Sequence, residues 1–228
     1  MATYDLEEQE QLAEIKVWWK QYGNLVINVF TAVMLAVSAW MGWSWYQRSQ
    51  SAQASIVFNV LQKAVQDKDS QRTKAASGEL LDKFGKSTYA SLGALTAAKE
   101  MVDAGDVKTA KLQLQWVVEH AEGELRDLAR LRLATVLLDE KEYDQALKQL
   151  DGNVSPGFAA LFADNRGDVL SAQGKKAEAL EAYKVALARL DNSDAKGAKS
   201  AQDRQSPSNT VYRELLQQKL DSLGGGKQ

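Results

Sequence analysis

The chain has 228 residues and a net charge of −2, and its length is sufficient for one soluble domain with its own core. The near balance of charge excludes the broad basic surface that nucleic-acid binding requires. The sequence contains no cysteine, so disulfide bonds and thiolate chemistry are excluded as well.

The first element expected along the chain is a membrane-spanning helix over residues 24–46. No charged residue lies between Gln21 and Gln47, and 23 helical residues reach about 35 Å, enough to cross a bilayer core of about 30 Å. A buried core helix would show a polar face, and a cleavable signal peptide would end in small residues. The segment therefore indicates a signal anchor. Aromatic side chains expected at the two membrane interfaces are Trp18, Trp19, Tyr22, Trp40, Trp43, Trp45 and Tyr46.

An acidic tail over residues 1–23 precedes the expected span. It carries five acidic residues and two lysines, a net charge of −3. Within about 20 residues of the span, each side has two basic residues, so charge bias does not fix the orientation. The N-terminal pair lies closer, which slightly favours a cytoplasmic tail.

A repeated spacing of small residues characterises residues 47–190. Pairs of small residues twelve positions apart recur, and their second members follow one another at intervals of 34, 36 and 33 residues. This period is typical of tetratricopeptide repeats, in which small residues let paired helices cross closely. Chance spacing in an alanine-rich chain is the alternative. The expected repeat-packing residues are Ala64, Ala76, Ala98, Ala110, Ala134, Ala146, Gly167 and Ala179.

The predicted fold is therefore all-α: a single N-terminal transmembrane helix, then a tetratricopeptide-like α-solenoid of about four degenerate repeats, then a C-terminal capping helix. Residues 191–208 are polar and predict a linker. Residues 209–223 predict the capping helix, with Asn209 or Thr210 as its N-cap. Residues 224–228 are expected to form a flexible tail.

Few residues in this chain point to chemistry. The single histidine, His120, falls at a predicted helix end, where a structural or exposed role is expected. Asp164 and Asp168 lie four residues apart on one helical face, and a solvated face is expected rather than a hydrolytic pair. We expect no cofactor, no metal and no enzymatic activity.

The remaining candidate site is the face lined by the first helix of each repeat. In this register the inward positions are mostly large and apolar, which favours binding of an extended polypeptide or a partner helix. The alternative is that these residues are core, or that the C-terminal helix covers them. The candidate face consists of Phe58, Leu61, Val65, Leu92, Leu95, Val102, Leu128, Leu131, Leu138 and Leu161.

The order of these parts, with WWKQYGN before the span and LLQQKLDSL near the end, resembles the YfgM family of bacterial inner-membrane proteins. The resemblance covers nearly the whole chain. It implies a single-pass protein of the inner membrane with a cytoplasmic N-terminus and a periplasmic repeat domain. It also implies association with the SecYEG translocon and with the membrane-anchored chaperone PpiD.

The function expected from this resemblance is a non-enzymatic adaptor that helps pass exported chains to periplasmic chaperones. The anchor would hold the repeat domain near the channel exit and so raise its local concentration there. The alternative is a signalling regulator, in which the cytoplasmic tail binds a response regulator and restrains the Rcs stress pathway.

Overall fold

The computed structural model describes residues 4–197 and 207–224, with side chains described over residues 16–191 and 209–224. These parts of the chain are helical, apart from short turns, and contain no strand. Two compact units are present, residues 1–52 and residues 53–228. In chain order the helices are α1 (Tyr4–Gln66), α2 (Ser70–Phe84), α3 (Thr88–Asp103), α4 (Val107–His120), α5 (Gly123–Asp139), α6 (Tyr143–Leu150), the 3₁₀ turn η1 (Pro156–Phe158), α7 (Ala159–Ala172), α8 (Lys176–Gly197) and α9 (Pro207–Ser222).

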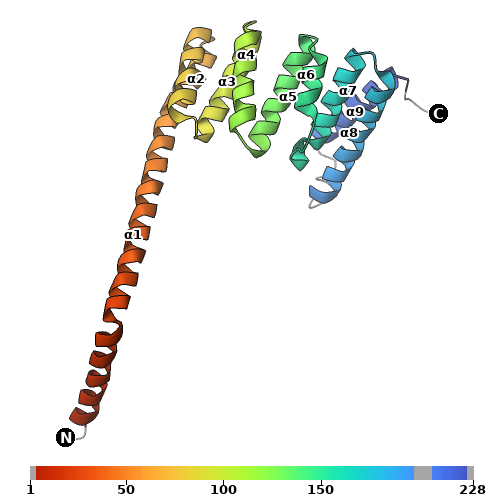
Figure 1. The fold of residues 1–228 in the computed structure, drawn as a ribbon. Helices are drawn as coiled ribbons and strands as arrows, with labels where there is room; N and C mark the ends of the chain where they lie inside the picture. Colours follow the sequence, from red (N-terminus) through yellow and green to blue (C-terminus); the bar gives the residue numbers. More distant parts are fainter. Residues whose placement is uncertain (1–3, 198–206, 225–228) are drawn as a thin grey trace. The chain divides into compact units, whose positions relative to one another are not determined.

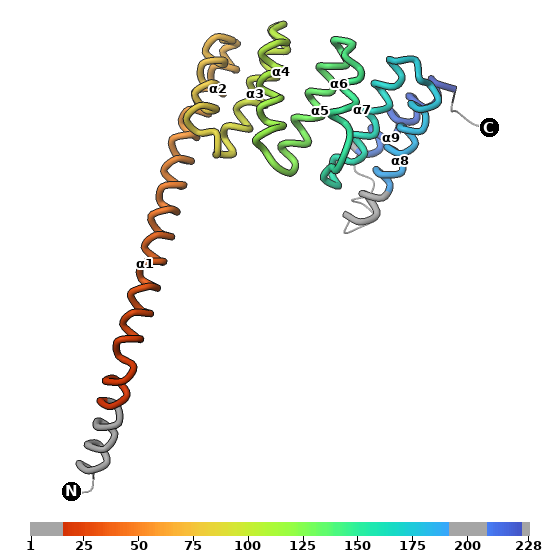
Figure 2. The backbone as a smooth tube through the Cα atoms, viewed as in Figure 1, coloured from red at the N-terminus to blue at the C-terminus, as the bar shows by residue number. Residues whose placement is uncertain are grey.

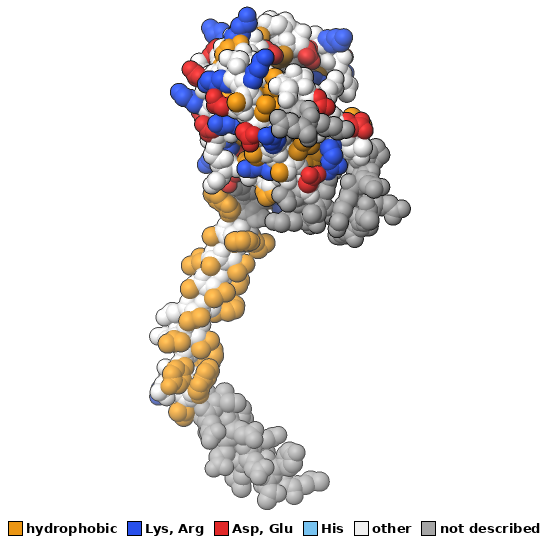
Figure 3. Space-filling model, turned by 90° about the vertical axis from the view of Figure 1, so that its right-hand side faces the viewer, with side chains coloured by type: hydrophobic (Ala, Val, Ile, Leu, Met, Phe, Trp, Pro, Cys, Tyr) orange, Lys and Arg blue, Asp and Glu red, His pale blue; other side chains and the backbone are white. Residues whose placement is uncertain are grey.

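The first unit consists of α1 up to residue 52. Among the described residues, α1 is the one helix long and apolar enough to cross a membrane, and its apolar window has no residue buried inside the protein. Large apolar side chains are exposed all along it, as Figure 3 shows in orange. A buried core helix is therefore wrong for this segment. The side chains of residues 1–15, which include the acidic cluster of the tail, lie outside the described residues.

The second unit is a row of antiparallel helices in which each helix packs on the next (Figures 1 and 2). The pairs are α3 with α4, α5 with α6, and α7 with α8. The end of α1 shares a buried apolar cluster with α2 and forms the first pair. Leucine, alanine and methionine side chains from both helices of each pair form the buried core. The predicted all-α fold with about four repeats and a C-terminal capping helix is confirmed.

Helix ends in this unit follow ordinary capping chemistry. The Asp69, Ser87 and Asp106 side chains accept hydrogen bonds from the backbone N–H three residues ahead, at 3.0, 3.3 and 3.1 Å. These bonds satisfy donors that the first helical turn leaves free. Gly105 and Gly174 adopt positive φ angles of 79° and 78° at turns between paired helices, which glycine tolerates without strain.

The eight small residues of the repeat spacing are all buried. The crossing of α7 and α8 is tight, because a Cβ atom on Gly167 would lie 2.4 Å from Cε1 of Tyr183. Side chains essentially never approach that closely, so this crossing requires glycine.

Two boundaries differ from the sequence-based prediction. Helix α8 continues to Gly197, seven residues into the expected linker over 191–208, and residues 198–206 lie outside the described residues. Helix α9 begins at Pro207, so the prediction of Asn209 or Thr210 as N-cap is wrong. Proline fits the first helical turn because the N–H that it lacks would have no partner there.

Candidate functional site: two surface hollows and a C-terminal latch

The face built from the first helices, α3, α5 and α7, is less apolar than the sequence predicts. Of its ten predicted residues, Leu61, Leu95 and Leu131 are buried in the core, so their assignment to an accessible face is wrong. Val102 and Leu161 are exposed at 38% and 37%. The other five are half-buried: Phe58, Val65, Leu92, Leu128 and Leu138. Leu95 and Leu131 belong to the buried core between neighbouring helices, so they do not point to the accessible face.

A hollow of about 380 Å³ lies between α3 and α5 on this face. Charged side chains of both signs line it, including Lys99, Asp103, Arg132 and Asp139. Arg132 Nη1 donates a hydrogen bond of 3.0 Å to the Leu95 carbonyl oxygen, which ties α5 to α3. The face is therefore a mixed polar surface with isolated apolar residues rather than a continuous apolar strip.

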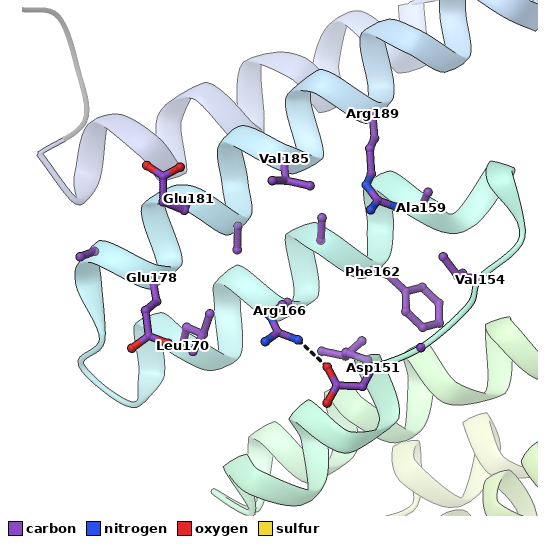
Figure 4. Close-up of a pocket in the computed structure, with 15 residues that line it drawn as sticks. Asp151, Val154, Ala159, Phe162, Arg166, Leu170, Glu178, Glu181, Val185 and Arg189 are labelled. Atoms are coloured by element: carbon purple, nitrogen blue, oxygen red, sulfur yellow. Dashed lines mark hydrogen bonds and ion pairs between the residues drawn. The ribbon is translucent and has the colours of Figure 1, made fainter.

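A larger hollow of about 670 Å³ lies between α7 and α8, beside the end of α6 (Figure 4). It exists because α6 has 8 residues where the equivalent helix α4 has 14, so the second half of this helix is missing. Phe162, Leu170 and Val185 contribute apolar surface to it. Figure 4 shows charged side chains around them, with Arg166 Nη1 paired to Asp151 Oδ1 at 2.6 Å.

A buried arginine holds the loop that replaces the missing part of α6. Arg130 Nε donates to the Gln149 carbonyl oxygen at 2.8 Å, and its Nη1 donates to the Asn153 carbonyl oxygen at 3.1 Å. Its guanidinium also lies 4.8 Å from the centre of the Phe162 ring. Asp127 accepts a hydrogen bond of 2.8 Å from the Ser155 backbone N–H. The two side chains keep the hollow open by fixing its loop wall.

Helix α9 is held against α7 and α8 by a cluster that we call the C-terminal latch: Asp164, Asp168, Tyr183, Tyr212 and Lys219. Lys219 Nζ lies 2.7 Å from Asp164 Oδ1 and 2.9 Å from Asp168 Oδ2. Tyr212 donates to Asp164 at 3.0 Å, and Tyr183 donates to Asp168 at 2.8 Å. Asp164 is 5% exposed, so the expectation of a solvated carboxylate face is wrong.

The latch also shifts the titration of its members. Burial raises the pKa of Asp164, and the hydrogen bond with Lys219 offsets only part of that rise. Burial alone would lower the pKa of Lys219, but its two carboxylate partners outweigh burial and raise it. Burial also raises the pKa of Tyr183 and of Tyr212.

The latch is suited to structure rather than to acid–base chemistry. A lysine and two tyrosine hydroxyls occupy both carboxylates, so neither is free to act on a substrate. His120 is exposed and its ring stacks on Trp116, with 4.3 Å between ring centres. Over the described residues, no group of three or more histidine, aspartate or glutamate side chains could hold a metal ion.

The chain matches the family model of the tetratricopeptide repeat-like domain over residues 16–225. It is 34% identical over 223 residues to the ancillary SecYEG translocon subunit of Neisseria gonorrhoeae, covering 96% of this chain and 98% of that protein. It is 30% identical over 189 residues to the ancillary SecYEG translocon subunit of Escherichia coli, covering 82% and 90%. Among solved structures, MamA 41-end from Desulfovibrio magneticus RS-1 aligns with a TM-score of 0.48 and 15% identity, covering 74% of this chain and 97% of that one. With a repeat-like domain over most of its length and relatives matched nearly end to end, this chain belongs to the YfgM family of ancillary SecYEG translocon subunits.

Proposed function

We propose that this protein is a membrane-anchored, non-enzymatic subunit that associates with the SecYEG translocon and offers its repeat domain to a partner polypeptide. The observation that carries the proposal is the combination of one exposed apolar helix with an open, helical-repeat domain in a chain related to ancillary translocon subunits. The anchor occupies the inner membrane in a single pass, with the N-terminus in the cytoplasm and the repeats in the periplasm.

The hollow between α7 and α8 is the favoured docking place on the repeat domain. Its apolar lining would bury aliphatic or aromatic side chains, and Arg189 and Glu178 at its edge offer charges of both signs to a polypeptide backbone or side chain. The mixed face around Val102 is the second docking place. Partners of suitable chemistry are PpiD, periplasmic chaperones and exported chains that have not yet folded.

Site-specific photo-crosslinking in intact cells tests this proposal. A photoreactive residue replaces Val185 in the hollow, Val102 on the first-helix face, or Glu119 as the control, which is exposed on α4 and lines neither hollow. We expect cross-links to PpiD or to exported chains from Val185, fewer from Val102, and none from Glu119. Equal cross-linking from all three positions would contradict a defined docking place.

The orientation has a separate test. Protease added to intact spheroplasts should digest the repeat domain, because the proposal places it outside the inner membrane. If the domain resists protease until the cells are lysed, it lies in the cytoplasm, and the adaptor proposal fails.

A further inference from the structure

The apolar part of α1 has two unlike sides. Asn24, Asn28, Thr31, Ser38 and Gly42 follow one another at intervals of four, three, seven and four residues. At about 100° per residue, these five positions fall within an arc of about 80°. We call them the polar stripe. Leu35 lies within the same arc, between Thr31 and Ser38, and is its one large apolar member over residues 24–42. Bulky apolar residues line the opposite side of the helix: Leu25, Val26, Phe30, Val33, Val37, Trp40 and Met41.

Asn28 makes this stripe costly in a lipid environment. Its side chain is exposed, and no hydrogen bond to it occurs within the described part of the chain. A primary amide carries two donors and an acceptor, and leaving them unpaired in hydrocarbon costs several kcal/mol by transfer from water. Polar side chains within membrane-spanning helices usually face another helix for this reason.

We propose that the polar stripe is the contact face between two copies of this chain, an inference that rests on the proposed membrane anchor. Two single-pass copies enter the membrane in the same orientation, so symmetry places Asn28 opposite Asn28 at equal depth. An amide is complementary to another amide, because each can both donate and accept. A different helix would have to supply matching polar groups at each of these depths.

The spacing and the side-chain sizes fit the same arrangement. Intervals of four and three residues are those of a left-handed pair of helices crossing at about 20°. Ser38 and Gly42 are small and four residues apart, which lets two backbones approach closely. The pairing brings two repeat domains into one assembly and raises the local concentration of their docking surfaces.

The absence of cysteine from the natural chain makes disulfide cross-linking a clean test. Single substitutions Ser38→Cys and Gly42→Cys lie on the stripe, and Val37→Cys and Met41→Cys are matched controls one residue away, about 100° around the helix. Each full-length variant is oxidised with copper phenanthroline in native membranes and separated on non-reducing gels. We expect disulfide-linked dimers from the two stripe variants, at least about fivefold more than from the controls. Adding Asn28→Leu to Ser38→Cys should reduce the dimer about threefold or more.

Three outcomes would overturn the inference. They are equal dimer formation at all four positions, no dimer from either stripe variant, and a mixed disulfide with a protein of another mass in place of the dimer. Extraction of the same membranes with alkaline carbonate separates this failure from that of the proposed function. If carbonate releases the protein, both the anchor and the pairing are wrong. If the protein stays in the membrane but forms no dimer, only the pairing is wrong.

Discussion

The middle repeats and the last repeat of this solenoid place different side chains at equivalent positions. Leu95, Leu131 and Asp164 follow one another at the repeat intervals of 36 and 33 residues, as do Ala98, Ala134 and Gly167. In the middle, the leucines are buried between neighbouring first helices. At the end, Asp164 is equally buried but pairs with Lys219 and Tyr212 of α9.

This difference shows that α9 is attached through buried charged and polar contacts, whereas the middle repeats pack through leucines alone at the equivalent position. It occupies the position of a further first helix, and its Leu216 and Leu220 are buried as in an ordinary repeat. The charged contacts add a requirement for one register, because a shift of α9 would leave a buried carboxylate unpaired. We therefore expect the middle repeats to tolerate the replacement of one apolar residue by another. In the last repeat, a change of Asp164 should be tolerated only when its partner Lys219 is changed as well.

The junction between the middle and the end should be the most sensitive point. Replacing Arg130 by methionine leaves Asp127 buried at 2% exposure without its cation and frees the loop after α6. Breaking a buried pair in this way costs about 3 kcal/mol or more of unfolding free energy. Arg126→Met on the same helix is the control, since Arg126 is exposed. Urea unfolding of the full-length protein in detergent, followed by circular dichroism, measures the difference. Equal midpoints for the two variants would contradict a role for Arg130 in holding the loop after α6.

Converting the last repeat to the leucine of the middle repeats tests the comparison directly. Asp164→Leu alone should cost about 2 to 3 kcal/mol, because it leaves Lys219 partly buried with one carboxylate instead of two. The double variant Asp164→Leu, Lys219→Met should recover most of that loss, since buried pairs are replaceable by apolar residues. The same unfolding assay reports both. If the double variant is no more stable than the single one, an apolar pair cannot replace Asp164 and Lys219, and the last repeat does not reduce to the packing of the middle repeats.

Much of the fold could be predicted from the sequence because the repeats show themselves as small residues at regular intervals. Small residues follow the local rule of close packing, and the eight that the repeat spacing singles out are all buried. The extension of α8 to Gly197 was missed, since polar residues in a long helix resemble a linker in composition. The start of α9 at Pro207 was misplaced because proline at a first helical turn also marks an ordinary turn.

The candidate site was harder to predict because it depends on pairing between distant residues. Asp164 and Lys219 are 55 positions apart, so the sequence shows two charged residues with no sign of contact. Leu95 and Leu131 are apolar at the right period, yet periodicity alone does not separate a core leucine from one on an open face. The hollow beside α7 follows from the short helix α6, for which Gly152 and Pro156 were the available signal.

The tight crossing at Gly167 offers a smaller test of the same comparison. Gly167→Ala copies Ala98 and Ala134, but here the new Cβ would meet the Tyr183 ring. We expect a net loss of about 1 to 2 kcal/mol, since overpacking outweighs the gain in helix propensity. Adding Tyr183→Leu, the residue type of the equivalent positions Leu114 and Leu150, should recover only part of that loss, because it relieves the overpacking but also removes the hydrogen bond from Tyr183 to Asp168.

Gly78→Ala is the control for Gly167→Ala, because nothing lies within 4 Å of its added Cβ. It should stabilise the protein slightly through helix propensity alone. A loss of similar size in both variants would mean that the crossing with Tyr183 is not the cause.

The smallest expected effect concerns the half-buried pair Asp106–Lys74, and its pH dependence should be opposite to that of the latch. The hydrogen bonds of Asp106 with Lys74 and Thr109 lower its pKa from 3.8 to about 2. Its contribution is therefore present above pH 3.8 and lost as the pH falls toward 2, so Asp106→Asn should approach the stability of the natural protein in acid. Burial raises the pKa of Asp164, so the natural protein should gain stability over Asp164→Asn as the pH falls toward 3.8. Urea midpoints of the three full-length proteins between pH 7 and pH 2 measure both trends, and parallel curves would show that the middle and the end do not differ in this way.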